Sequence, residues 1–138
     1  ARTLAGTQHD NIVAVHDVGK VINPLLIEGQ VHGGMAMSIG AALYENLMID
    51  PDSGRIYNNN MLDYKVPTIM DVPDLEAAFV ETHEPTHPYG SKSLGEPPVL
   101  SPAPAIRNAV LDATGVAINE LPLNPKTLFK HFRAAGLI

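Results

Sequence analysis

One glutamate in a glycine- and proline-rich stretch is the side chain best suited to acid–base chemistry. Residues 88–98 read PYGSKSLGEPP. Glycine allows close backbone approaches, and proline fixes its own φ and disfavours the helical region for the residue before it. We therefore expect Glu96 to sit at a rigid, non-helical corner, where its carboxylate could act as a general base aimed at one point. The residues alone leave a second interpretation open, a surface loop whose glutamate lies in water.

A second candidate motif lies just upstream and is rejected as a metal site. Residues 83–87 read HEPTH, which matches the zinc-protease pattern H-E-x-x-H. That pattern works only on a helix, where both histidines share one face. Pro85 lies between the two histidines, and a proline in a helix interior costs about 3 kcal/mol. We predict a non-helical segment that does not bind zinc.

Short strands and helices must position these residues. The β-branched run at 11–18 predicts a strand, at whose end His16 and Asp17 either have a function or bond to neighbouring backbone. Asn-Pro and Ser-Pro pairs predict helix starts. The predicted class is α+β, in a single domain covering residues 1–138, with short mixed strands, one long glycine-rich helix and two shorter C-terminal helices. The predicted strands are 11–18, 75–82 and 116–119, with a hairpin at 47–57, and the predicted helices are 23–46, 101–114 and 126–135.

The long predicted helix carries glycines at positions 29, 33 and 40, near one face. Each interior glycine costs about 1 kcal/mol relative to alanine, which indicates that another helix or a bound cofactor comes very close. On a regular helix Gln30 and His32 cannot form one site together, and Gln30 is the better candidate for facing whatever approaches. Polar residues interrupt the apolar stretch, so a membrane span is not expected.

Composition excludes several classes of function. The chain has 138 residues, a formal net charge of −6 and no cysteine. Scattered basic residues on an acidic chain do not favour nucleic-acid binding. Without cysteine the chain forms no disulfide and offers no thiolate ligand to zinc or to an iron–sulfur cluster. We expect a cytoplasmic protein. The first residues lack an initiator methionine and a signal-peptide core, so we expect a piece of something longer, either a fragment of a larger protein or a separately encoded part.

Taken together, the motifs resemble the C-terminal part of the molybdenum-binding subunit of the molybdenum hydroxylases, with xanthine dehydrogenases the most similar group. The resemblance covers nearly the whole chain, in order. Its motifs are DVGKVINP at 17–24, EGQVHGG at 28–34, DYKVP at 63–67, GSKSLGEPP at 90–98, AIRNAV at 105–110, ATG at 113–115 and LPLNP at 121–125.

The resemblance implies a site and a reaction. In that family the glutamate corresponding to Glu96 is the general base, taking a proton from the hydroxyl on molybdenum before it attacks an electron-poor carbon. By resemblance Gln30 and Gly33 contact the molybdenum–pterin cofactor, with or without a nucleotide, and so does the backbone of Lys92, Ser93, Leu94 and Gly95. The pterin supplies the metal ligands, so no residue of this chain is expected to bind the metal.

The resemblance also implies partners. Iron–sulfur clusters and FAD are expected on other domains or subunits, together with the remainder of the molybdenum-binding subunit and a small heterocyclic substrate. The family subunit is several times longer than this chain, so the isolated chain is expected to be inactive. Ser93 is a minor departure from the small residue common at that position. The alternative function is a non-catalytic fragment or interaction module of the same ancestry that does not bind the cofactor on its own.

Overall fold

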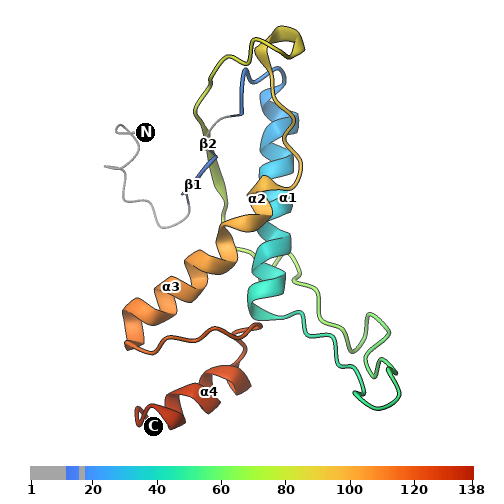
Figure 1. Cartoon of the computed structure of the whole chain (residues 1–138), viewed down its shortest axis with the longest axis vertical. Helices are drawn as coiled ribbons and strands as arrows, with labels where there is room; N and C mark the ends of the chain where they lie inside the picture. Colours follow the sequence, from blue (N-terminus) through green and yellow to red (C-terminus); the bar gives the residue numbers. More distant parts are fainter. Residues whose placement is uncertain (1–11, 16–17) are drawn as a thin grey trace.

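A computed structural model describes residues 12–15 and 18–138 of the chain. The long helix α1, Pro24–Leu43, is the axis around which the other elements are arranged (Figure 1). Asn23 caps it, its side-chain oxygen accepting a hydrogen bond from the Leu26 backbone N–H at 3.1 Å, and Pro24 occupies the first turn. The predicted Asn-Pro helix start is confirmed, although the helix ends three residues before the predicted boundary at Asn46.

One face of α1 is buried at helical spacing. It includes Val31, Gly34, Met35, Ser38, Ile39 and Ala42. Val18, Val31 and Met35 form the centre of a small apolar core, against which partly buried side chains of β2, of the 90–95 loop and of the first turns of α1 pack. α1 therefore packs against β2 and against the segment that follows β1.

Two strands confirm the predicted β segments in shortened form. β1, Ile12–Val15, pairs in parallel with β2, Glu76–Phe79, with Ile12 opposite Glu76. The predicted positions of His16 and Asp17 lie outside the described residues. The architecture is thus mostly helical, with a two-stranded parallel sheet beside α1 (Figure 1).

The predicted strand at 116–119 is wrong. No strand forms there, because the side chain of Arg107, and not a neighbouring strand, makes the hydrogen bonds to this segment. Arg107 donates from Nε to the Ile118 carbonyl at 3.1 Å and from Nη2 to the Asn119 side chain at 2.9 Å. The predicted hairpin at 47–57 forms only one isolated bridge, Ile49 with Ile56.

Three helices follow the glycine-rich loop. α2, Pro97–Leu100, was not predicted, whereas α3, Pro102–Thr114, and α4, Pro125–Ala134, confirm the two C-terminal helices. α1 contacts both α2 and α3. Ser38 of α1, which is fully buried, accepts a hydrogen bond from the Ala103 backbone N–H at 3.0 Å and so ties α3 to the axis.

None of the helices in the described part of the chain is long and apolar enough to cross a membrane.

Candidate cofactor site

The glycine-rich loop is held by the segment that follows β1. Gly19 and Ser91 form an antiparallel bridge. The Lys20 N–H donates to the Gly90 carbonyl at 2.8 Å, and the Lys92 N–H donates to the Val18 carbonyl at 3.2 Å. Backbone pairing between two segments far apart in sequence therefore fixes the start of the loop that leads to Glu96.

Gly19 is required for this pairing. Its φ is +65°, and a Cβ there would lie 2.6 Å from the Lys92 nitrogen and 2.8 Å from the Gly90 carbonyl oxygen. Any side chain would push the loop away, because real Cβ atoms do not approach backbone atoms so closely. The role of Gly19 in holding the loop was not predicted from the sequence.

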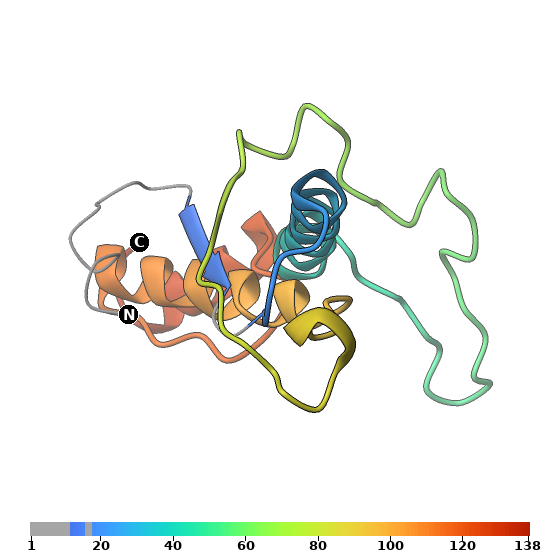
Figure 2. The same cartoon turned by 90° about the horizontal axis from the view of Figure 1, so that it is seen from above.

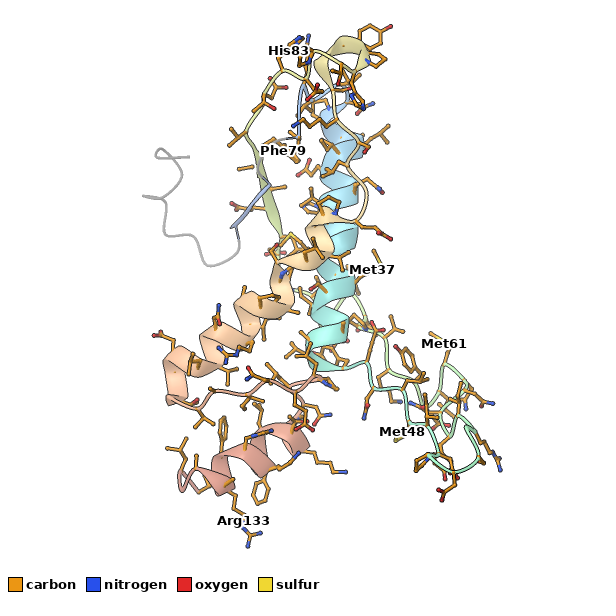
Figure 3. The ribbon with its side chains drawn as sticks, viewed as in Figure 1. Met37, Met48, Met61, Phe79, His83 and Arg133 are labelled. Atoms are coloured by element: carbon orange, nitrogen blue, oxygen red, sulfur yellow. The ribbon has the colours of Figure 1, made fainter. Side chains whose placement is uncertain are left out.

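A sharp turn precedes the loop. The short 3₁₀ helix η1, Pro88–Gly90, contains Tyr89 at φ 60° and ψ 8°, followed by Gly90 at φ 72°. A non-glycine residue in this left-handed region is uncommon. A Cβ on Gly90 would collide with the ring of His83, whose position beside this turn is labelled in Figure 3. The turn is thus fixed by close packing as well as by proline.

Gln30 and the loop meet at one pocket. The pocket is open and has a volume of about 260 Å³. Of the residues predicted to contact the cofactor, Gln30 of α1 and Lys92 and Leu94 of the loop line it. Its full lining is Lys20, Ile22, Asn23, Leu26, Ile27, Gln30, Ser91, Lys92 and Leu94. His32 lines a different pocket, against residues 67–75, which agrees with the prediction that Gln30 and His32 do not share a site.

The other predicted residues lie outside this pocket. Gly33, Ser93 and Gly95 are exposed and do not line it. A Cβ on Gly33 would meet no atom of the chain within 4 Å. The close approach predicted at Gly33 is therefore not made by this chain's own residues, and the same is true of Gly29.

The glycines of α1 that make close contacts are others. A Cβ on Gly34 would lie 2.8 Å from Cβ of Pro98 in α2, and one on Gly40 would lie 2.8 Å from Cδ of Pro67. The prediction of close approach is right for Gly40. The close contact at Gly34 was not predicted, because it depends on Pro98, which lies far away in the sequence.

Glu96 is exposed and lies at the start of α2. Its carbonyl accepts a hydrogen bond from the Val99 N–H at 2.8 Å, and its side chain makes no capping bond. Its φ and ψ are −89° and −15°, in the helical region. The prediction that Pro97 would keep Glu96 out of the helical region is wrong, because the new helical turn outweighs the steric preference of a residue before proline. Glu96 does not line the pocket of Gln30.

The residues missed in the pocket include both charged and polar groups. Lys20, Asn23 and Ser91 line it. Asn23 was recognised as a helix cap, and the pairing of Lys20 and Ser91 with opposite segments could not be anticipated from local sequence. Two lysines, two side-chain amides, one serine and several apolar side chains therefore converge at the first turns of α1.

The H-E-x-x-H match does not lie on a helix. Residues 83–87 form no helix. Among the described residues, no group of three or more His, Asp or Glu side chains could hold a metal ion. The prediction of a non-helical segment is confirmed.

Glu84 stabilises the turn before the loop. Its carboxylate accepts hydrogen bonds from the Thr86 hydroxyl at 2.5 Å and from the Thr86 N–H at 3.0 Å. These bonds, with smaller contributions from the nearby charges of Lys92 and His87, lower the pKa of Glu84. A carboxylate with a lowered pKa in the folded state stabilises the fold above its unfolded pKa, and that contribution is lost as pH falls through the folded pKa.

Glu84→Gln should therefore remove part of the acid sensitivity of the protein. We expect the wild type to lose more thermal stability than the variant as pH falls below the ordinary carboxyl value of about 4.5, measured as melting temperature between neutral and acidic pH. Glu76→Gln, an exposed glutamate of β2, is the matched control and should follow the wild type. Parallel melting curves for the wild type and Glu84→Gln would contradict this assignment.

The comparisons with known proteins show the family of the chain. The molybdopterin cofactor-binding domain family matches residues 3–73. The chain belongs to this family. It is 61% identical to the xanthine dehydrogenase molybdenum-binding subunit of Escherichia coli O157:H7 over 94% of this chain and 17% of that subunit. It is 35% identical to the nicotine 6-hydroxylase large subunit of Paenarthrobacter nicotinovorans over 88% of this chain and 15% of that subunit.

A solved structure shows the same fold. Quinoline 2-oxidoreductase from Pseudomonas putida 86 superposes with a TM-score of 0.81 and 34% identity, covering 88% of this chain and 16% of that one. This molybdopterin-domain chain therefore spans about a sixth of the length of the relatives it matches. The family predicted from the motifs is confirmed.

Proposed function

We propose that this chain is the C-terminal part of the molybdenum-binding subunit of a xanthine dehydrogenase-like enzyme, which hydroxylates a purine or another N-heterocycle with water as the oxygen source. The observation that carries the proposal is the pocket shared by Gln30, Lys92 and Leu94. These residues were selected from two separate motifs, and the fold brings them to one place. The identity to a xanthine dehydrogenase subunit supports the choice of reaction.

The pocket suits a pterin bearing an anionic group. Leu26, Ile27 and Leu94 offer an apolar surface for a flat ring, and the Gln30 amide can both donate and accept hydrogen bonds along a ring edge. Lys20 and Lys92 supply positive charge for a phosphate. When bound, the molybdenum–pterin cofactor would supply the two-electron redox chemistry of the enzyme.

Glu96 is the residue that we assign as general base. It is the one carboxylate of the loop, and the packing of Pro98 on Gly34 fixes the turn that carries it. Its exposure leaves the carboxylate accessible to a substrate held by the remainder of the subunit. Ser93 and Gly95 flank Leu94 and would present backbone to the cofactor, and Gly33 would leave room for it beside α1.

The proposal includes partners. The chain spans 17% of the molybdenum-binding subunit that it resembles, so the remainder of that subunit, and iron–sulfur and FAD subunits, are proposed partners of a cytoplasmic enzyme. The remaining alternative is a fragment of the same ancestry that does not bind the cofactor.

Replacing Gln30 by alanine tests the pocket. In the complete subunit, Gln30→Ala should lower the molybdenum content of the purified protein, because one edge of the pterin loses its hydrogen bonds, while the melting temperature of the cofactor-free protein stays unchanged. Glu28→Ala is the matched control, since Glu28 is an exposed α1 residue that does not line the pocket.

Molybdenum is measured by elemental analysis after gel filtration, together with the mass of the protein. Full molybdenum content in Gln30→Ala would show that the pocket is not part of the cofactor site. A wild-type subunit that carries no molybdenum would instead favour the non-catalytic alternative.

A further inference from the structure

A long irregular segment projects from the body of the protein. Residues 46–72, here named the arm, leave the C-terminal end of α1 and return just before β2, and both views show them extending away from the helices (Figures 1 and 2). The arm contains neither helix nor strand and has one isolated bridge. Segments of this length without regular structure are uncommon in compact domains and often carry a function.

Polar side chains fix the first half of the arm. Asn58 is only 2% exposed. Its Oδ1 accepts a hydrogen bond from the Met48 N–H at 2.9 Å, and its Nδ2 donates one to the Asn46 carbonyl at 2.7 Å. At the tip, Asp50 accepts hydrogen bonds from the Tyr57 hydroxyl at 2.6 Å and from the Asp52 N–H at 2.9 Å. These bonds lower the pKa of Asp50, so the carboxylate stays charged and in place.

The second half is fixed in the same way. Asp71 accepts from the Thr68 N–H at 2.8 Å and from its hydroxyl at 2.7 Å. The Tyr64 hydroxyl donates to Glu45 at 2.6 Å, which joins the arm to the end of α1. The shape of the arm is therefore set by hydrogen bonds within and at the base of the arm.

Its apolar side chains point outward instead. A loop adapted to water buries its apolar side chains, whereas in this arm many large apolar side chains are exposed together with the polar ones. Ile69 and Met70 are each 89% exposed. Met48 and Met61 are seen on the arm in Figure 3. The exposed large apolar residues of the arm are Leu47, Met48, Ile49, Ile56, Tyr57, Met61, Leu62, Val66, Ile69 and Met70.

We infer that the arm is a preformed docking element that lies on an apolar surface of the remainder of the molybdenum-binding subunit. The inference rests on the proposed function for the identity of the partner. An exposed apolar surface of this extent marks an interaction site. A shape set in advance by local hydrogen bonds lowers the entropy lost on docking. Aspartates 50 and 71 are engaged by hydrogen bonds within the arm, so these two carboxylates do not require a basic matching surface.

The lengths of the relatives favour this occupant over a second copy of the chain. The matched segment is 17% of the xanthine dehydrogenase subunit and 15% of the nicotine hydroxylase subunit. In both, the matched segment is covalently joined to several times its own mass. A surface on the same polypeptide has a far higher effective concentration near the arm than a surface on a separate copy of the chain, because it is covalently linked.

Methionine oxidation in the complete subunit tests the inference. Met61 is 73% exposed and Met70 89% in this chain, whereas Met35 is buried in the core. If the arm is docked, dilute peroxide should oxidise Met61 and Met70 at least about tenfold more slowly in the folded subunit than in the same subunit unfolded in guanidinium. Met35 should show similar protection and reports that the subunit is folded. Oxidation of Met61 and Met70 at the unfolded rate, with Met35 protected, would overturn the inference.

Two variants and a cross-link identify the occupant. Met61→Asp should abolish the protection of Met70 while Met35 stays protected, whereas Asn59→Asp, which adds the same charge at an exposed polar position of the arm, should leave Met70 protected. A photoreactive phenylalanine at position 69 should cross-link within the same polypeptide. A cross-link to a second copy or to another subunit would overturn the assignment of the partner. None of these readouts depends on molybdenum or on turnover, so they can fail without affecting the proposed function.

Discussion

Glu96→Gln should lower kcat of the complete enzyme by at least about 10²-fold, because a positioned general base contributes about 10²–10⁴-fold. Glutamine keeps the size and hydrogen-bonding reach of the side chain but cannot accept the proton. Since the Glu96 side chain makes no capping bond and is exposed, the substitution should leave α2 and the melting temperature unchanged. The measurement is the anaerobic rate of enzyme reduction by substrate, with molybdenum content determined in parallel.

The control is Glu81→Gln. Glu81 is another exposed glutamate, which accepts a hydrogen bond from the Val21 N–H at 2.9 Å. It should leave the rate of reduction within a few-fold of wild type. A Glu96→Gln enzyme that holds molybdenum and is reduced at the wild-type rate would show that Glu96 is only a structural residue of the α2 turn.

Gly34→Ala should lower both the stability of the protein and kcat of the complete enzyme. The new Cβ would lie 2.8 Å from Cβ of Pro98 and 3.3 Å from backbone atoms of α2. Overpacking of this kind costs about 1–3 kcal/mol, which outweighs the gain of about 1 kcal/mol from replacing a glycine in a helix interior. Relief of the clash moves α2, and a displacement of about 1 Å at a catalytic group can cost about 10²-fold in rate.

Gly29→Ala is the matched control, on the same helix. A Cβ there meets no atom of the chain within 4 Å, so the variant should gain up to about 1 kcal/mol from helix propensity. Denaturant titration measures both changes, and kcat of the complete enzyme measures the displacement of Glu96. Equal stability changes in the two variants would show that Pro98 yields to the new methyl group.

Local signals were sufficient for the helices. The Asn-Pro pairs at 23–24 and 124–125 predicted two helix starts that the structure confirms with capping bonds from Asn23 and Asn124. Gly115 ends α3 at φ 72°, as expected of a C-terminal glycine. Each of these signals acts within a few residues, so the sequence alone reveals it.

Non-local pairing explains what was missed. Residues 116–119 could form a strand only beside a neighbouring strand. In the structure Arg107 makes the hydrogen bonds to this segment instead. The need for glycine at position 34 comes from Pro98, which no helical periodicity can reveal. For the candidate site, motif resemblance selected Gln30 and Lys92, but their meeting at one pocket with Lys20 depends on the pairing of residues 18–20 with 90–92.

The bridge between Gly19 and Ser91 has a kinetic consequence. The helices can form from local contacts on fast timescales, but the loop takes its place only after a chain segment of some seventy residues has closed on itself, which is an entropically costly and slow step. The pocket beside Gln30 therefore assembles late in folding. A chain with its helices already formed but the Gly19–Ser91 bridge still open would remain unable to take up a cofactor, so insertion of the cofactor would follow, rather than guide, the folding of this region.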